Sequence, residues 1–320
     1  MTLAIECRQL VKTYAGKPPV EAVRGIDVEV EVGECFGVLG PNGAGKTTTI
    51  EILEGLLSPT SGEVKVLGRD WQTDADEIKE RIGISLQETQ LSDKLTVKET
   101  LDLFRSFYRD SITADEAMEQ VSLQSKAKSW VKKLSGGQKQ RLAVATALVG
   151  DPELIFLDEP TTGLDPQSRR QLWDIIHDFR NRGRSVLLTT HYMDEAERLC
   201  DRVAIVDHGK IIALGTPKAL IQQVGGDHVV EFSIDEHAKN QLPDDELKAL
   251  PSVLTVQQNA DHVLLSVKSP HVTIPALLER LQRDGLSFNS LTTRQSSLED
   301  VFVSLAGRSL VEDEAEEAAA

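Results

Sequence analysis

The chain is poor in aromatic residues, cysteine and net positive charge, and each shortage argues against a class of function. Aromatic residues are 4% of the 320 positions, which disfavours a nucleic-acid surface built on stacked rings. The three cysteines, Cys7, Cys35 and Cys200, are too few and too scattered for a disulfide framework or a zinc cluster. A net charge of −16 argues against broad binding to a phosphate backbone, so no direct nucleic-acid partner is expected.

Long apolar runs are also missing. No stretch approaches the ~18–20 apolar residues that a membrane-spanning helix needs. The first six residues show no basic segment followed by an apolar one, so no signal peptide is expected. Hydrophobic residues still make up 40% of the chain, enough to bury a core. The sequence predicts one large or two modest folded domains that do not cross a membrane by themselves.

Residues 1–226 alternate short apolar segments with longer amphipathic ones, which is typical of an α/β fold. Between about residues 88 and 150 the periodicity becomes helical, with Val97, Leu101, Phe104 and Tyr108 on one face, which predicts a helical subdomain. The expected strands are Ala4–Leu10, Ile26–Val32, Cys35–Leu39, Leu154–Leu157, Ser185–Thr190 and Arg202–Val206.

Gly225-Gly226 marks a boundary, and residues 227–308 are predicted to form a small α+β domain with the order β-α-β-β-α-β. Residues 309–320 are rich in acidic residues and alanine, and are expected to be a disordered tail. The expected elements of the small domain are strand Val229–Ile234, a helix around Ala238–Leu250, a hairpin of Val253–Gln258 with His262–Lys268, helix Ile274–Arg283, strand Leu286–Thr292 and helix Leu298–Leu305.

A glycine-rich loop carries the clearest chemistry. It follows the strand Cys35–Leu39, precedes a predicted helix Thr48–Glu54, and matches G-x-x-x-x-G-K-[ST]. In such a loop the backbone N–H groups point at phosphate oxygens, the lysine reaches the β- and γ-phosphates, and the hydroxyl binds Mg²⁺. The loop is Gly40-Pro41-Asn42-Gly43-Ala44-Gly45-Lys46-Thr47.

Two adjacent acids end the apolar run Leu154–Leu157. A buried parallel strand would deliver both to the carboxyl edge of its sheet. We expect Asp158 to hold Mg²⁺ through water and Glu159 to act as general base towards the attacking water. Taken alone, a strand that ends in Asp-Glu is more often structural, so this assignment depends on the phosphate loop.

A second anion site is predicted where Ser135-Gly136-Gly137-Gln138 leads into a helix at Lys139–Val149. The alternative is an ordinary capped helix, which the local sequence by itself favours.

Together these motifs resemble the nucleotide-binding subunits of ABC transporters. The resemblance implies a P-loop NTPase fold with a RecA-like core, an antiparallel β subdomain and a helical subdomain. It covers about residues 3–216. The family motifs, in the residues of this chain, are the Walker A loop Gly40–Thr47 with Thr48, the Walker B strand Leu154–Glu159, the signature Leu134–Gln138, the Q-loop Gln87, the D-loop Gly163-Leu164-Asp165, the switch His191 and the A-loop Tyr14.

The resemblance also implies a mechanism. Family members form head-to-tail homodimers, with each ATP between one Walker A loop and the other subunit's signature residues, here Ser135, Gly136, Gly137 and Gln138. His191 would orient the γ-phosphate, and Asp165 would couple the two sites. Gln87 would sense the γ-phosphate and Mg²⁺ and pass closure to the helical subdomain, where membrane subunits dock.

Three of these residues have simpler readings. Tyr14, which would stack on adenine, could serve only for packing. His191 alone would more often be a surface or core histidine. Asp165 precedes Pro166 and is expected to cap a helix as well.

A further motif near the end narrows the group. Leu298-Glu299-Asp300-Val301-Phe302-Val303 resembles the C-terminal motif of ABC-2-type export ATPases, which include drug- and antibiotic-resistance exporters. The same residues predict an amphipathic helix, with Leu298, Val301, Phe302 and Leu305 on one face and a capping box of Ser296 with Glu299.

The resemblance therefore implies an ATP-hydrolysing subunit at the cytoplasmic face of a bacterial inner membrane, attached through its partners. It would power export of a drug-, antibiotic- or lipid-like substrate through separate ABC-2-type permease subunits. The alternatives are an importer ATPase with a regulatory C-terminal domain, and a soluble ABC ATPase that acts on nucleic acid or ribosomes.

Overall fold

The computed structural model describes residues 2–87, 89–223, 226, 228–234, 242–258 and 262–306. The chain divides into two compact units, and the second begins at Pro217. This division precedes the boundary expected at Gly226, because helix α8 (Pro217–Gln223) packs with α12 (Leu298–Ala306) in the second unit. The acidic tail predicted at 309–320 lies outside the described residues. Within the described ranges, no helix combines the length and the apolar character needed to span a bilayer.

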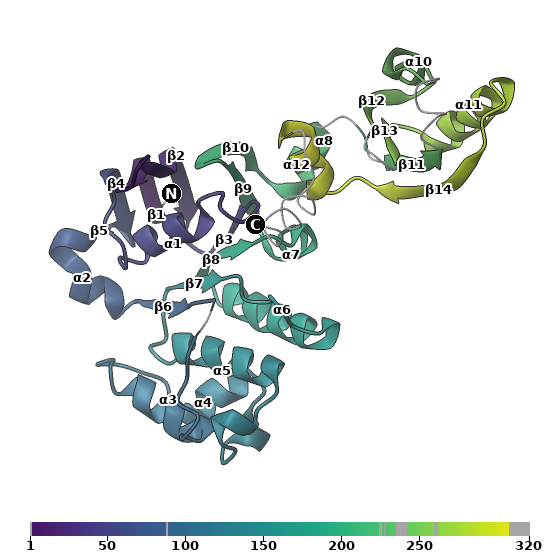
Figure 1. The fold of residues 1–320 in the computed structure, drawn as a ribbon. Helices are drawn as coiled ribbons and strands as arrows, with labels where there is room; N and C mark the ends of the chain where they lie inside the picture. The colour runs from purple at the N-terminus through teal and green to yellow at the C-terminus, as the bar shows by residue number, and fades with distance from the viewer. Residues whose placement is uncertain are drawn as a thin grey trace. The chain divides into compact units, whose positions relative to one another are not determined.

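The first unit is built on a six-stranded sheet (Figure 1). Its order is β10-β9-β3-β8-β7-β6, and every neighbouring pair is parallel except β9 with β10. Every residue of β3, β7 and β8 is buried, as expected for parallel strands covered on both faces. The strands are β3 (Cys35–Leu39), β6 (Ile82–Ser85), β7 (Leu154–Asp158), β8 (Ser185–Thr190), β9 (Arg202–Asp207) and β10 (Lys210–Gly215).

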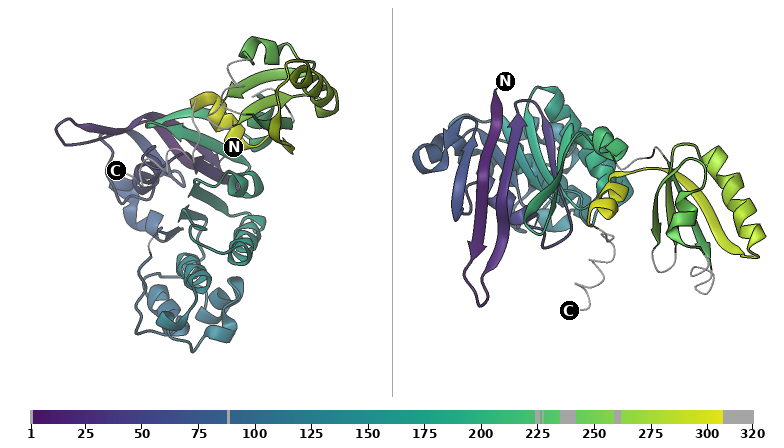
Figure 2. Two further views of the ribbon diagram at one scale, coloured as in Figure 1. Left: turned by 45° about the vertical axis from the view of Figure 1, so that its right-hand side comes forward. Right: turned by 90° about the horizontal axis from the view of Figure 1, so that it is seen from above.

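An antiparallel sheet of order β2-β1-β4-β5 shares a core with the parallel strands. Its long strands β1 (Leu3–Tyr14) and β2 (Val20–Glu31) extend beyond the segments that the sequence predicted. Helix α1 (Lys46–Leu53) contributes Ile50, Ile52 and Leu53 to the same core. Figure 2 shows, from above, the purple strands β1 and β2 beside the teal strands of the larger sheet. The remaining elements are β4 (Ser61–Val66), β5 (Arg69–Asp70) and α2 (Trp71–Lys79).

Helices α3 (Val97–Arg105), α4 (Ala114–Gln120) and α5 (Gly136–Leu148) form the helical subdomain, which lies at the bottom of Figure 1. Val97 and Leu101 are buried, as predicted. Tyr108 does not share their helical face, because α3 ends at Arg105 and the chain turns before it. Two more helices, α6 (Pro166–Asn181) and α7 (Met193–Leu199), follow strands β7 and β8.

The second unit has the predicted order β-α-β-β-α-β between α8 and α12. Its antiparallel sheet, of order β12-β13-β11-β14, packs its own core, which includes Phe232, Leu265 and Leu277. Of the helix expected at Ala238–Leu250, the described part is α10 (Asp244–Lys248). The other elements are β11 (His228–Ile234), β12 (Val253–Gln258), β13 (Val263–Val267), α11 (Pro270–Arg283) and β14 (Phe288–Gln295).

The cap of α12 differs from the predicted capping box of Ser296 with Glu299. Ser297 N and Oγ both donate to Asp300 Oδ2, at 2.8 and 3.1 Å. Arg294 donates to both oxygens of the same carboxylate at 2.7 Å. Burial raises the pKa of Asp300, but the bonds from Arg294 and Ser297 outweigh it and leave that pKa below its ordinary value. This cap brings Leu298, Val301 and Phe302 into the interior, whereas Leu305 is half exposed.

Candidate active site

The glycine-rich loop forms the predicted turn between β3 and α1. Gly45 precedes the first helical residue with φ +101°, and a Cβ there would lie 2.3 Å from Ala22 O. A Cβ on Gly40, at φ +154°, would lie 2.1 Å from Val206 O. A Cβ would collide with the neighbouring backbone at either position, so only glycine allows the loop to pass this close.

Lys46 begins α1, and its ammonium group sits inside this loop. Nζ donates to Gly40 O at 2.9 Å and to Pro41 O at 3.0 Å, and the side chain is buried. The neighbouring Thr47, in the first turn of α1, is exposed. The helix N-terminus and the buried ammonium together create a positive site that suits phosphate oxygens.

Four adjacent parallel strands each lead, at the same edge of the sheet, to one residue of the predicted active site. In sheet order β3, β8, β7 and β6, the chain continues from the carboxyl end of each strand to Lys46, His191, Glu159 and Gln87. The chain order of these strands is different, so this meeting depends on the sheet topology. Ligands of open α/β sheets bind at this edge, outside the carboxyl ends of the strands.

These four side chains, Lys46, Gln87, Glu159 and His191, form the carboxylate cluster, with Glu159 at its centre. Its Oε1 lies 3.6 Å from Lys46 Nζ, and its Oε2 lies 3.2 Å from His191 Nδ1. Gln87 Nε2 donates to Oε2 at 3.3 Å, and Thr162 Oγ1 donates to it at 3.2 Å. The predicted residues Lys46, Gln87 and His191 therefore surround one carboxylate.

The environment of Glu159 favours its charged form. Burial raises its pKa, but His191, Lys46 and Thr162 together outweigh burial, so the pKa lies below its ordinary value. Its backbone has φ +45°, an uncommon conformation for a residue with a side chain. A deprotonated carboxylate held in a fixed orientation is what a general base requires.

Asp158 stands in a different environment from its neighbour. Burial raises its pKa and the charge of Glu159 adds to this effect, while the hydrogen bond from Thr189 and the positive charge of Lys46 oppose it without reversing it. Thr189 Oγ1 donates to Asp158 Oδ1 and accepts from Glu159 N at 3.0 Å. Sequence reasoning missed Thr189 and Thr162, because a threonine in an apolar strand or a turn gives no local signal of its partner.

Tyr14 lies beside the phosphate loop. Its hydroxyl is 3.3 Å from Thr48 Oγ1, and Lys12 Nζ sits 5.3 Å from the ring centroid. Its side chain is partly exposed, so the ring is accessible next to α1.

The signature segment forms the N-terminus of α5. Ser135 caps the helix, accepting from Gln138 N at 3.3 Å, while Gln138 Oε1 accepts from Ser135 N at 3.1 Å. Ser135 and Gly136 are exposed, whereas Gly137 packs so closely against Ser168 of α6 that a Cβ would lie 2.3 Å from Oγ. An exposed, capped helix start is suited to bind an anion.

Asp165 caps α6, as predicted. Oδ1 accepts from the N–H groups of Gln167 and Ser168 at 3.0 Å, and Oδ2 accepts from Ser168 Oγ at 2.6 Å. The bonds from Ser168 hold the pKa of Asp165 below its ordinary value. Ser168 also packs against Gly137. Through this serine, Asp165 is connected to the start of the signature helix α5.

The donors near the phosphate loop fit a hard cation better than a soft one. Thr47, Gln87 and Asp158 offer hydroxyl, amide and carboxylate oxygens, which are ligands that Mg²⁺ accepts alongside water and phosphate. No group of three or more His, Cys, Asp or Glu side chains suited to a metal occurs among the residues that the structure describes. This set therefore suits a cation that shares its coordination with a nucleotide.

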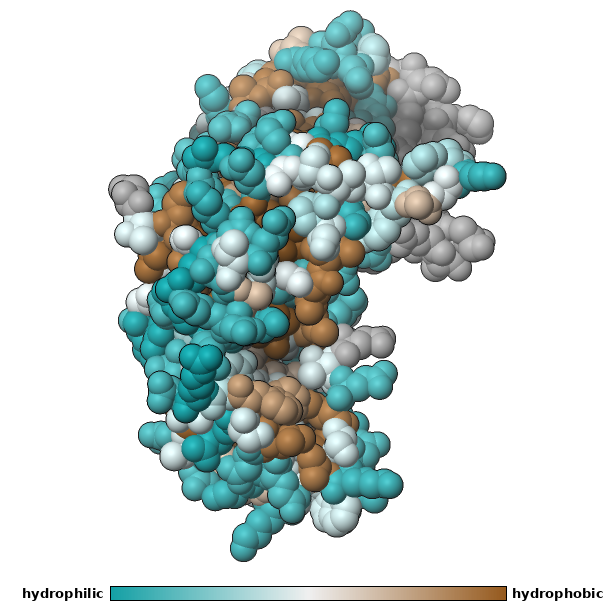
Figure 3. Space-filling view, turned by 90° about the vertical axis from the view of Figure 1, so that its left-hand side faces the viewer, coloured by the Kyte–Doolittle hydropathy of each residue, from teal (hydrophilic) through white to brown (hydrophobic). Residues whose placement is uncertain are grey.

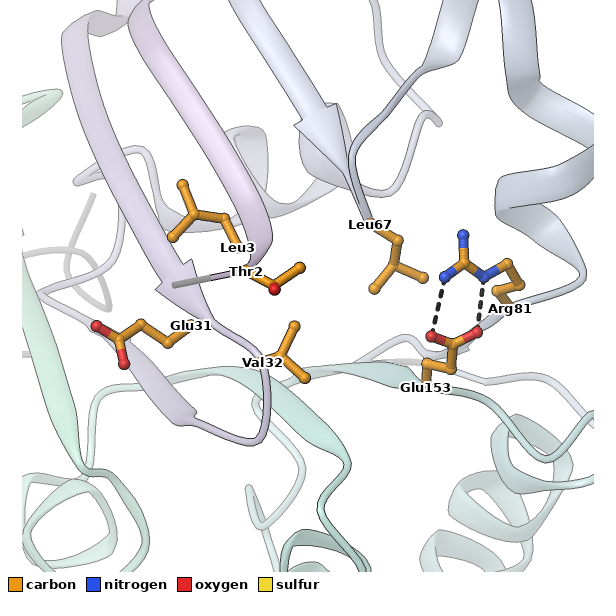
Figure 4. A pocket seen from close by; sticks show the side chains of 7 residues that line it. All are labelled: Thr2, Leu3, Glu31, Val32, Leu67, Arg81 and Glu153. Atoms are coloured by element: carbon orange, nitrogen blue, oxygen red, sulfur yellow. Dashed lines mark hydrogen bonds and ion pairs between the residues drawn. The ribbon is translucent and has the colours of Figure 1, made fainter.

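A separate pocket of about 410 Å³ lies at the other end of the strands (Figure 4). Arg81 and Glu153 close one side of it with two hydrogen bonds, of 2.7 and 2.9 Å. They precede β6 and β7, while Gln87 and Glu159 follow these strands, so the pocket is not part of the carboxylate cluster. It is lined by Thr2, Leu3, Glu31, Val32, Leu67, Arg81 and Glu153.

Comparisons with known proteins agree with this geometry. The family model described as "ABC transporter" matches residues 23–162, and that of the "ATP-binding protein DrrA1-3-like, C-terminal domain" matches residues 215–306. The daunorubicin/doxorubicin resistance ATP-binding protein DrrA of Streptomyces peucetius is 38% identical, over 99% of this chain and 97% of its own length. The Nod factor export ATP-binding protein I of Rhizobium meliloti (strain 1021) is 39% identical, over 97% of this chain and 90% of its own.

Solved structures give the same fold. A dimeric ATP-binding cassette in a post-hydrolysis state, bound to ADP and Pi, is 28% identical with a TM-score of 0.61, over 66% of this chain and 98% of that one. An ATP-binding subunit of an ABC transporter is 27% identical with a TM-score of 0.62, over 69% and 93%. The phosphate loop, the carboxylate cluster and these relatives lead to one conclusion: the chain belongs to the ATP-binding subunits of ABC transporters, in the group of the ABC-2-type exporter ATPases, and is an ATP-hydrolysing enzyme.

Proposed function

We propose that this ATPase works as a homodimer that hydrolyses MgATP and powers export of a drug-, antibiotic- or lipid-like substrate through separate ABC-2-type permease subunits. The observation that carries the hydrolytic part is the meeting of Lys46, Gln87 and His191 around Glu159. Export is supported by the relatives, which are named for drug resistance and for Nod factor export.

Mg²⁺ would be held by Thr47, Gln87 and Asp158, the last of these through water. When bound, Mg²⁺ neutralises charge on the β- and γ-phosphate oxygens. The oxygen donors of these three residues, placed around the phosphate loop, support the assignment.

Glu159 would accept a proton from the attacking water, since its lowered pKa leaves it ionised near neutral pH. Lys46 would exchange its contact with Glu159 for the β- and γ-phosphates, which frees the carboxylate for this role. His191 would orient the γ-phosphate and the water, and Gln87 would report their presence to the helical subdomain. The contacts of both residues with Glu159 Oε2 support these roles.

ATP would be bound by the whole loop and by one aromatic ring. Backbone N–H groups bind the phosphates, and Tyr14 stacks on adenine, supported by its exposed ring beside Thr48. The binding residues in this subunit are Tyr14, Gly40, Pro41, Asn42, Gly43, Ala44, Gly45, Lys46, Thr47 and Thr48.

The second subunit would complete each site. Ser135, Gly136, Gly137 and Gln138 would contact the γ-phosphate bound by the other copy, and Asp165 would couple the two sites. The exposed start of α5 and the dimeric cassette among the structural neighbours support this arrangement.

The permease would dock on the helical subdomain and place the ATPase at the cytoplasmic face of a bacterial inner membrane. In this subdomain Leu103 and Phe107 expose 46% and 67% of their surface, and Leu86, which follows β6, exposes 41%. Figure 3 shows one face of the molecule, with hydrophobic residues, in brown and tan, on its lower part, where this subdomain lies. A cytoplasmic helix of the permease with an apolar face would cover them.

The test is transport by inside-out vesicles that contain the chain and its ABC-2-type permease subunits. We expect ATP-dependent accumulation of an anthracycline such as daunorubicin, or of a lipid-like compound, and none with Glu159→Gln. ATP-driven uptake of a solute by right-side-out vesicles loaded with ATP would contradict export. An ATPase rate that does not respond to the permease would contradict coupling.

A further inference from the structure

Thr189 lies at the carboxyl end of β8, directly beside Asp158 in the parallel register of β7 and β8. Its side chain is fully buried. His191 follows two residues later, so the end of this one strand carries both residues toward the carboxylate cluster.

The hydroxyl of Thr189 bonds to the carboxylate of Asp158 and to the main-chain N–H of Glu159. A hydroxyl has one proton to donate and can accept further bonds. Because Glu159 N can only donate, the 3.0 Å bond between them makes Oγ1 the acceptor, and its single proton goes to Asp158 Oδ1. The direction of each bond is therefore fixed, and the carboxylate of Asp158 is held by one oxygen.

The main chain of Glu159 depends on the same contact. Its φ of +45° is a conformation that residues with a Cβ rarely adopt, and the surrounding structure must stabilise it. Glu159 N also donates to Thr189 O at 3.2 Å, so its N–H makes two bonds to one residue of β8.

We propose that Thr189 is a positioning residue of the ATPase reaction, whose hydroxyl orients the Asp158 carboxylate towards Mg²⁺ and the Glu159 main chain towards the attacking water. This rests on the roles of Asp158 and Glu159 in the proposed function. Residues that hydrogen-bond a metal ligand typically alter metal affinity or activity about 10–100-fold when removed. A purely structural threonine would need only its branched shape, which valine reproduces.

The experiment compares Thr189→Val, which keeps the shape and removes the hydroxyl, with Thr189→Ser, which keeps the hydroxyl. Valine should lower kcat about 10–100-fold and change KM less, while serine should stay within about threefold of the wild type. A second measurement uses a non-hydrolysable ATP analogue, with Mg²⁺ and with EDTA. Valine should reduce the gain in affinity that Mg²⁺ provides and leave the affinity in EDTA unchanged.

A matched control is Thr273→Val. Thr273 is a fully buried threonine of the second unit, and its hydroxyl donates to Pro251 O at 2.8 Å. This variant should lose a similar amount of thermal stability while keeping its kcat and its response to Mg²⁺. Thr189→Ala removes the hydroxyl without the branched shape, and it should lose the same fold in kcat as Thr189→Val.

The proposal is overturned if Thr189→Val or Thr189→Ala keeps the wild-type kcat and Mg²⁺ response, or if serine loses as much as valine. A different result would overturn the proposed function itself, namely a folded wild-type chain that hydrolyses no MgATP. A wild-type enzyme that hydrolyses MgATP beside an equally active valine variant would leave the proposed function intact and remove only the role of Thr189.

Discussion

Glu54 provides a test of the packing around α1 that is independent of ATP. It follows α1, its side chain is 2% exposed, and neither carboxylate oxygen has a hydrogen-bond partner among the described residues. Burial, with smaller contributions from Asp158 and Glu51, raises the pKa of Glu54 to about 8. We therefore expect Glu54→Gln to make the fold less sensitive to alkaline pH.

The direction of this pH effect follows from the number of protons bound by the folded and by the unfolded chain. Below the ordinary pKa of 4.5 both the folded and the unfolded chain hold the proton, so the contribution of Glu54 to stability is fully present. Between 4.5 and about 8 only the folded chain keeps it, and the free energy of unfolding falls by up to ~1.4 kcal/mol per pH unit. Glutamine carries no such proton, so the variant should gain about 4 kcal/mol relative to the wild type between pH 5 and pH 8.5.

The assay is thermal unfolding of both proteins across this pH range. For a unit of this size 1 kcal/mol corresponds to about 2–4 °C, so the Tm difference should grow by roughly 8–16 °C from pH 5 to pH 8.5. The matched control, Glu63→Gln, removes an exposed carboxylate from β4 and should show a small difference at every pH. A Glu54→Gln effect of equal size at pH 5 and pH 8.5 would refute the reasoning.

The nucleotide site leads to three further predictions. Glu159→Gln should bind ATP normally, lose at least about 100-fold in turnover and accumulate as a dimer by size exclusion, whereas a monomeric and fully active variant would contradict the mechanism. Lys46→Ala should bind ATP about 10-fold or more weakly by equilibrium binding, because a charge-assisted contact with phosphate is lost, and an unchanged affinity would remove the loop from the argument. Tyr14→Phe should keep the affinity for ATP and Tyr14→Ala should lower it, about 5- to 100-fold if the ring stacks on adenine; equal affinities in all three proteins would show that the ring only packs.

Features that depend on neighbouring residues could be predicted from the sequence. The phosphate loop follows from glycines at positions where a Cβ would collide, next to an apolar strand and a helix. Asp165 before Pro166 predicted the start of α6. The cap of α12 was displaced by one residue, because Ser296 and Ser297 are chemically equivalent and only Arg294, from β14, places Asp300 beside the second of them.

The carboxylate cluster could be predicted only through the family resemblance. Nothing local to Gln87, Glu159 or His191 states that their strands are neighbours, since sheet order differs from chain order. Thr189 and Glu54 gave no signal at all, because a hydroxyl or a carboxyl acquires its role from what surrounds it after folding.

The sequence by itself therefore determined the buried strands β3, β7, β8 and β9, the order of β-α-β-β-α-β in the second unit, and the phosphate loop, because each depends on residues within a few positions of one another. The tertiary structure decided which side chains form hydrogen bonds or ion pairs with one another. Parallel pairing of β3, β8, β7 and β6 brings Lys46, His191, Glu159 and Gln87 to one edge. There, burial leaves the pKa of Asp158 raised, whereas neighbouring charges and hydrogen bonds outweigh burial and lower the pKa of Glu159. Such pKa values depend on desolvation and on charges a few ångströms away, which exist only once distant segments have packed together.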